Sequence, residues 1–166
     1  WRQRHVQGAL WFGGLLLAVS WVNWWGAFQV VVGTDINAYI SLSKFEYIGT
    51  ALIPILWMRF AAHFSGRELP FMLYRRLIAL FIASVTILLA FTNEYHGLIW
   101  SKPAFVMIAD SPVFDPQYGL WFWVNFIFSY IIFTIGSVML VRYALETWRL
   151  YRFQALLILI ATALPW

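Results

Sequence analysis

Four polar side chains lie within or directly beside long apolar runs of the sequence: Asn23, Glu46, His96 and Asn125. Polar and ionisable groups are costly in apolar surroundings, so each is a candidate for a functional role. Glu46 is either such a functional carboxylate or one that lies near enough to water to stay solvated. Histidine changes charge near neutral pH, so His96 is either a titrating group or a solvated loop residue. We expect the two asparagine amides to make hydrogen bonds between helices.

No arrangement of residues in the sequence is typical of catalysis. The chain has three histidines, which are far apart in sequence, and no cysteine. It contains no glycine-rich phosphate loop, no GxSxG nucleophile motif and no HExxH zinc motif. We therefore assign no catalytic residue, no metal site and no cofactor, and we predict that this segment is not an enzyme.

The composition indicates a membrane protein. Of the 166 residues, 63% are hydrophobic and only 11% are charged, whereas soluble proteins have about 25% charged residues. The net charge of +4 comes from short basic clusters between apolar runs. This pattern is typical of membrane topology and not of phosphate recognition. A soluble enzyme and nucleic-acid binding are thereby excluded, and the lipid bilayer is the expected partner.

Long apolar runs predict the elements that position the polar side chains. A helix needs about 20 apolar residues to cross the hydrocarbon core, and the runs do not alternate in polarity as barrel strands do. We predict an all-α fold, a polytopic helical membrane bundle that forms a single transmembrane domain over 1–166, with about five helices visible. Because the sequence starts at Trp1 and ends within an apolar run at Trp166, we expect a fragment of a longer protein. The expected spans are 9–32, 45–64, 73–92, 119–141 and a truncated 153–166.

The distribution of basic residues favours one orientation in the membrane. Lys and Arg concentrate in cytoplasmic connectors. If the first, third and fifth connectors are cytoplasmic, nine of the eleven basic residues lie on that side, and only Lys44 and Lys102 lie outside. We therefore expect residue 1 on the cytoplasmic side. The connector that holds Asp35 and Lys44, and the long connector 93–118, are then expected outside.

The connector 93–118 is the longest, and long loops are often functional or mobile. It is either a sensing loop or a passive cover, and its segment 105–108 is expected to be a short strand or to dip into the membrane interface. Trp and Tyr residues border it; they either anchor the bundle at the headgroup level or belong to a ligand cage. The candidate ligand-binding residues, for a small ligand of unspecified chemistry, are Glu46, His96, Trp100, Tyr118, Trp121 and Asn125.

Four blocks of the sequence resemble a known family when they are taken in order. The most specific reads Ala90-Phe91-Thr92-Asn93-Glu94-Tyr95-His96-Gly97-Leu98-Ile99-Trp100. The others are Phe45-Glu46-Tyr47-Ile48-Gly49 followed by Pro54, Trp57, Phe60 and Ser65-Gly66-Arg67; Tyr118-Gly119 with Trp121 and Ser129-Tyr130; and Leu150-Tyr151-Arg152-Phe153-Gln154-Ala155-Leu156 leading to Pro165. Together they resemble the N-terminal seven-transmembrane sensor region of bacterial histidine kinases, in which the first block reads LTNPLHGLFW. Glu94-Tyr95 replaces the Pro-Leu of that motif, and Glu46 stands where the family commonly has a polar uncharged residue.

The resemblance covers 40–166 and has consequences for fold and function. It implies a fragment of a seven-helix bundle, from the second helix to the start of the sixth. It also implies a sensory input module of the two-component histidine kinase type, which passes an outer-face or bilayer signal to a cytoplasmic kinase or cyclase domain. The implied location is the bacterial inner (cytoplasmic) membrane, with a homodimer or partner membrane subunits as the assembly.

A second function stays open at this point. Aromatic residues make up 20% of the chain, and tryptophan-rich faces are able to pack on partner helices, pigment, quinone or lipid. The alternative is therefore a non-catalytic structural or cofactor-contacting subunit of a larger membrane protein complex.

Overall fold

The computed structural model describes residues 8–66, 72–108 and 111–147 of the chain. Within these residues the protein is mostly helical, with five helices and four short strands. In chain order the elements are α1 (Ala9–Val32), α2 (Ile36–Phe64), α3 (Met72–Phe91), α4 (Asn93–His96), β1 (Trp100–Lys102), β2 (Phe105–Ile108), β3 (Ser111–Phe114), β4 (Gln117–Tyr118) and α5 (Leu120–Thr147).

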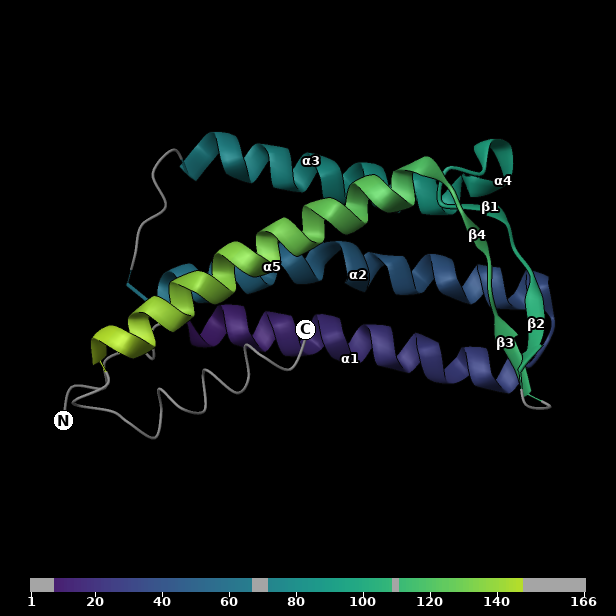
Figure 1. Cartoon of the computed structure of the whole chain (residues 1–166), viewed down its shortest axis with the longest axis horizontal. Coiled ribbons are helices and arrows are strands. Elements are labelled where there is room, and N and C mark those ends of the chain that lie inside the picture. The colour runs from purple at the N-terminus through teal and green to yellow at the C-terminus, as the bar shows by residue number, and fades with distance from the viewer. Residues whose placement is uncertain (1–7, 67–71, 109–110, 148–166) are drawn as a thin grey trace.

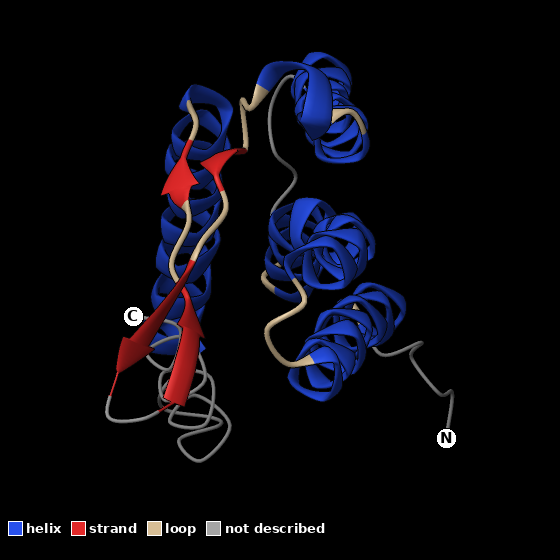
Figure 2. Cartoon of the chain, turned by 90° about the vertical axis from the view of Figure 1, so that its right-hand side faces the viewer, coloured by secondary structure: helices blue, strands red, loops and turns tan. Residues whose placement is uncertain are grey.

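The long helices form two layers. In Figure 1, α1, α2 and α3 lie side by side, and α5 crosses them. The end-on view of Figure 2 shows α5 and the strands on one side of this three-helix layer. α2 is the central helix, because it contacts α1, α3 and α5, whereas α3 and α5 touch only slightly. α4 and the strands lie together at one end of the bundle, and we call residues 93–118 the cap.

A core centred on Trp57 holds α2 between α1 and α5. Trp57 packs with Leu15 of α1 and Leu140 of α5, and all three side chains are buried. Its indole Nε1 donates a hydrogen bond to the carbonyl oxygen of Phe133 in α5 at 3.3 Å. Buried indole N–H groups usually find such a partner, so this bond fixes the orientation of Trp57 across the contact between α2 and α5.

α2 starts at Ile36 and not at residue 45, so the expectation that Asp35 and Lys44 share a connector is wrong. Asp35 caps the helix, because its Oδ1 accepts hydrogen bonds from backbone N–H groups two and three residues later (3.0 and 3.2 Å). The hydroxyls of Ser41 and Ser43 donate to carbonyl oxygens four residues earlier (2.8 and 2.9 Å). These polar side chains lower the hydropathy of the segment, but they bond to the backbone of the helix and do not interrupt it.

Two helices of the described residues are long and apolar enough to cross a membrane: α1 and the segment Leu120–Glu146 of α5. α1 covers the residues of the first expected span, and α5 runs past the expected end at 141. α3 contains a shorter apolar segment, Leu77–Phe91. The expected segment 153–166 lies outside the described residues. Large apolar side chains face outward along the helices, and such surfaces mark contact with a membrane or another protein.

The described residues of the cap, 93–108 and 111–118, form regular elements and not an irregular loop. β2 and β3 pair antiparallel, with Phe105 opposite Phe114, so of the two alternatives for 105–108 the short strand is confirmed. Both phenylalanine rings contact Tyr39 of α2, at 5.3 and 4.4 Å between ring centroids. β1 and β4 form a second antiparallel pair directly before α5. The cap therefore folds onto the start of α2 and leads into α5.

Candidate functional site: the cap and its junction with α5

Asn93, at the start of α4, organises the cap. Its Nδ2 donates to the carbonyl oxygen of Trp100 (2.9 Å), and its Oδ1 accepts from the backbone N–H groups of Ile99 (2.9 Å) and Trp100 (3.2 Å). Gly97 ends α4 in the left-handed conformation, with φ of 61°, and its N–H donates to the carbonyl oxygen of Asn93 at 2.8 Å. One buried amide thus satisfies three main-chain groups and fixes the turn that follows α4.

The residues that Asn93 holds form a buried aromatic and aliphatic cluster. Ile99 and Trp100 pack with Ala90 of α3, and Tyr47 and Trp121 cover this group. The rings of Tyr47 and Trp100 meet edge to face, with centroids 5.0 Å apart. The cluster therefore joins α2, α3 and α5 at the base of the cap.

The first turn of α5 is held by carbonyl groups of the cap. The oxygen of Leu98 accepts from the backbone N–H groups of Trp121 (2.9 Å) and Phe122 (3.3 Å), and the oxygen of Ile99 accepts from that of Gly119 (2.9 Å). The first N–H groups of a helix have no partner within the helix. A Cβ atom at Gly119 would lie 2.3 Å from two carbonyl oxygens of the cap, so this contact requires glycine. The cap thus replaces an N-terminal capping side chain for α5.

Both ring nitrogens of His96 have protein partners. Nδ1 accepts a hydrogen bond from the backbone N–H of Leu98 at 3.0 Å. Nε2 lies 3.1 Å from Oγ1 of Thr92, whose hydroxyl also donates to the carbonyl oxygen of Leu88 at 2.8 Å. His96 is exposed, but these bonds tie its ring to both sides of the turn at Gly97.

Trp121 and Asn125 meet at Thr86 of α3. The indole Nε1 of Trp121 donates to Oγ1 of Thr86 at 2.9 Å, and this hydroxyl lies 3.2 Å from Oδ1 of Asn125. Thr86 and Asn125 are buried. The interhelical hydrogen bond expected for Asn125 is confirmed, and it lies where α3 and α5 otherwise touch little. The amide of Asn23 instead donates to the carbonyl oxygen of Val19 in its own helix at 2.8 Å, so the corresponding expectation for Asn23 is wrong.

An ion pair between Lys44 of α2 and Glu94 of α4 links the cap to α2. The hydrogen bond from the Lys44 ammonium lowers the pKa of the Glu94 carboxyl below its usual value, and a backbone N–H adds to this effect. Nearby, burial raises the pKa of the Tyr39 phenol, with smaller contributions from the charges of Glu46 and Tyr118. The Glu94 carboxylate is exposed, although the Lys44 side chain is mostly covered, so the pair adds little stability by itself.

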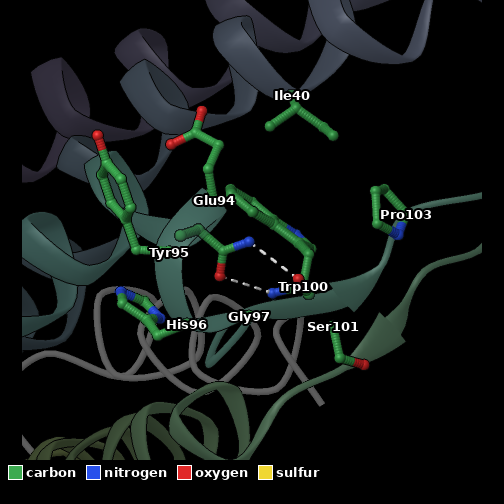
Figure 3. A pocket seen from close by; sticks show the side chains of 9 residues that line it. Ile40, Glu94, Tyr95, His96, Gly97, Trp100, Ser101 and Pro103 are labelled. Atoms are coloured by element: carbon green, nitrogen blue, oxygen red, sulfur yellow. Dashed lines mark hydrogen bonds between the residues drawn. The ribbon is translucent and has the colours of Figure 1, made fainter.

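An open pocket of about 460 Å³ lies between α4, β1 and Ile40 of α2. In Figure 3, Glu94, Ile40, Trp100 and Pro103 surround the open space, and Tyr95 and His96 lie to one side of it. Asn93, Gly97 and Ser101 complete the lining. Two of the sequence-predicted residues, His96 and Trp100, therefore share this pocket.

A family model described as the N-terminal 7TM region of histidine kinase matches residues 1–166. The chain belongs to this family. No match was found among curated proteins or among solved structures. By this membership the chain is the N-terminal sensory membrane region of a histidine kinase, a region that is not itself catalytic. Separately, the described residues hold no group of three or more His, Cys, Asp or Glu side chains that could bind a metal ion.

In this sensory region, five of the six predicted ligand-binding residues lie at the cap or at its junction with α5. Tyr118 pairs with Trp100 across β1 and β4 and stacks on Phe122, with ring centroids 3.8 Å apart. Glu46 points elsewhere, because its Oε2 accepts from Nε2 of Gln29 in α1 at 2.6 Å. Its position on α2 turns it toward α1, away from the pocket.

Three residues that build this junction were not predicted from the sequence: Thr86, Asn93 and Gly119. Asn93 belongs to the motif that carries the resemblance, so the motif itself was the available signal. Gly119 belongs to the block Tyr118-Gly119 of the same resemblance, so it had the same kind of signal, whereas Thr86 lies in an apolar run outside these blocks. Their importance follows from contacts with residues distant in sequence.

Proposed function

We propose that the chain is the input module of a two-component histidine kinase, in which the cap receives a signal and α5 passes it to a cytoplasmic output domain. One observation carries this proposal: the main-chain groups of 98–100 are bonded to Asn93 on one side and to the start of α5 on the other. A displacement of the cap therefore acts directly on the first turn of α5.

The length of α5 supports transmission across the membrane. Its 28 residues correspond to roughly 42 Å at about 1.5 Å per residue, which exceeds the roughly 30 Å of hydrocarbon. Figure 1 shows α5 running from the cap to the opposite end of the bundle. The excess of basic residues in alternate connectors supports a cytoplasmic location for that opposite end, in the inner membrane of a bacterium.

A small ligand is proposed to act at the cap pocket. His96 and Trp100 line the pocket, and Tyr118, Trp121 and Asn125 lie at the junction behind it. Glu46 is bonded to α1, so a role for it would be separate from this pocket.

The test compares phosphorylation by the full-length protein in membranes with that of two threonine variants. Thr86→Val removes the acceptor of the Trp121 indole between α3 and α5. Thr134→Val removes a hydroxyl that is exposed and bonds only within α5. We expect Thr86→Val to change the level of phosphorylation while the protein stays in the membrane, and Thr134→Val to leave it unchanged. Equal phosphorylation in both variants and the parent would contradict the proposal.

A second candidate function rests on the outer surface of α1. Among the described residues α1 contacts mainly α2, and Leu10, Leu17 and Trp24 are exposed by 81%, 74% and 65%. This surface is suited to partner helices, lipid or a cofactor in a larger membrane complex, or to a second copy in a homodimer. Purification in mild detergent separates the two: stoichiometric foreign subunits favour the complex, and a monodisperse homodimer favours the sensor.

A further inference from the structure

The two hydrogen bonds of His96 require a neutral ring. Because the N–H of Leu98 donates to Nδ1, this nitrogen holds a lone pair and no proton. The hydroxyl hydrogen of Thr92 is used by the carbonyl oxygen of Leu88, so Oγ1 accepts a hydrogen bond from Nε2. Both contacts thus assign the same tautomer, with the proton on Nε2.

A second proton on the ring goes to Nδ1, where it faces the N–H of Leu98. Two donors at a separation of 3.0 Å do not bond, so the contact between His96 and Leu98 is lost. The carbonyl oxygen of the same residue, Leu98, accepts from the N–H groups of Trp121 and Phe122. Protonation therefore acts on the residue that holds the first turn of α5.

Among the described residues, no carboxylate forms a hydrogen bond with the His96 ring, so none offsets the positive charge of the protonated ring in this way. Glu94 of α4 is already paired with Lys44 of α2. The other titratable groups of the surrounding elements are Tyr95 of α4, Lys102 at the end of β1 and Tyr118 of β4, while α3 between 77 and 91 contributes none.

We propose that protonation of His96 loosens the contact between the cap and α5, so that the cap responds to acidification on its own side of the membrane. The effect of this protonation on signalling rests on the proposed function, whereas the local opening of the cap does not depend on that function. Histidine is suited to this role because its charge changes between about pH 5 and 8.

Hydrogen–deuterium exchange of the full-length protein in lipid nanodiscs tests the opening. Exchange is compared at about pH 7.5 and about pH 5.5, which bracket the range of histidine titration, with labelling times scaled to the intrinsic exchange rates. We expect peptides covering 97–101 and 118–123 to open about fivefold more at the lower pH, the change expected for one net hydrogen bond. His63→Gln is the matched control, because His63 lies near the opposite end of α2 and bonds to Arg59.

Two variants at the site itself separate protonation from other effects of pH. His96→Gln keeps an oxygen that can accept from Leu98, so its cap should show no such difference between the two pH values. His96→Lys carries a charge at both values, so its cap should be open at both. Nitrogen NMR shifts of the histidine ring in the parent protein provide a check without substitution, and we expect Nδ1 to be unprotonated at the higher pH.

The proposal would be overturned if cap exchange in the parent did not depend on pH. It would also be overturned if His96→Gln showed the same difference between the two pH values as the parent. A ring protonated on Nδ1 at the higher pH would overturn it as well. A pH-dependent opening that leaves phosphorylation unchanged would support the histidine switch and contradict the proposed signalling function, so the two failures are distinguishable.

Discussion

Replacement of Asn93 by alanine is expected to release the cap from the end of α3. The substitution removes three hydrogen bonds to the buried residues Ile99 and Trp100. At about 1 kcal/mol for each net bond, the free energy of local cap opening falls by about 3 kcal/mol. Since about 1.4 kcal/mol corresponds to a tenfold change in an equilibrium constant, opening should increase on the order of a hundredfold.

Hydrogen–deuterium exchange of peptides covering 97–101 and 118–123 measures this change. The second peptide contains Gly119 and Trp121, whose N–H groups bond to the cap and not to Asn93, so faster exchange there reports transmission to α5. Asn23→Ala is the matched control, because that amide is exposed and bonds only within its own helix. We expect the control to change stability by no more than about 0.5 kcal/mol.

Asn93→Asp separates the acceptor role of the side chain from its donor role. The aspartate still accepts from the N–H groups of Ile99 and Trp100 but no longer donates to the oxygen of Trp100. Because the second carboxylate oxygen then faces the carbonyl oxygen of Trp100 in a buried site, an exchange rate clearly above that of the parent is expected. Cap peptides of the control Asn23→Ala should exchange within about threefold of the parent rate. If cap peptides of Asn93→Ala do the same, the estimate from three net hydrogen bonds is wrong, and Asn93 does not organise the cap.

Three further outcomes follow from the same contacts. Gly119→Ala should destabilise the protein by about 2 kcal/mol or more. Gly26→Ala should be neutral or slightly stabilising, because a Cβ atom there would meet no atom within 4 Å. Equal thermal midpoints of the two variants would contradict this. Thr86→Val leaves the indole N–H of the half-buried Trp121 unpaired and should cost about 1–3 kcal/mol in detergent unfolding. Thr134→Val, whose hydroxyl is exposed, should cost much less. Because the folded pKa of Glu94 is lowered, its ion pair supports the cap above about pH 4.5 and is lost as the pH falls through the folded pKa. Cap exchange in the parent should therefore rise further as the pH falls below about 4.5, in addition to any change caused by His96 at higher pH, and Glu94→Gln should lack this further rise.

The long helices could largely be predicted from hydropathy, because apolar runs of sufficient length have few alternatives in a membrane. α1 occupies the expected residues 9–32. The start of α2 could not be found in this way, because Asp35, Ser41 and Ser43 lower the hydropathy while their side chains bond to the helix backbone. Hydropathy measures the preference for lipid, whereas the helix boundary depends on hydrogen bonding.

The junction was only partly predictable for a different reason. Asn125 was expected to bond between helices because an amide in an apolar run needs a partner, and it meets Thr86. The role of Asn93 depends on the conformation of the turn that brings the N–H groups of Ile99 and Trp100 close to its side chain. This conformation could not be predicted from the sequence. Glu46 lies on α2, as do Tyr39 and Tyr47, which contact the cap. The Glu46 side chain instead bonds to Gln29 of α1, and this contact depends on how α2 packs on α1.

The most direct test of the account ties β1 to β4, the strand that leads directly into α5, with a disulfide in the full-length protein. The sequence contains no cysteine, so a pair can be introduced at Lys102 and Gln117, which face each other across β1 and β4. A control pair at Val106 and Val113 closes the β2–β3 hairpin on itself. We predict that oxidation of the first pair changes the level of autophosphorylation, that a reductant restores it, and that the control pair has no effect. Autophosphorylation that is unchanged by oxidation of the first pair would contradict signalling through the cap and α5.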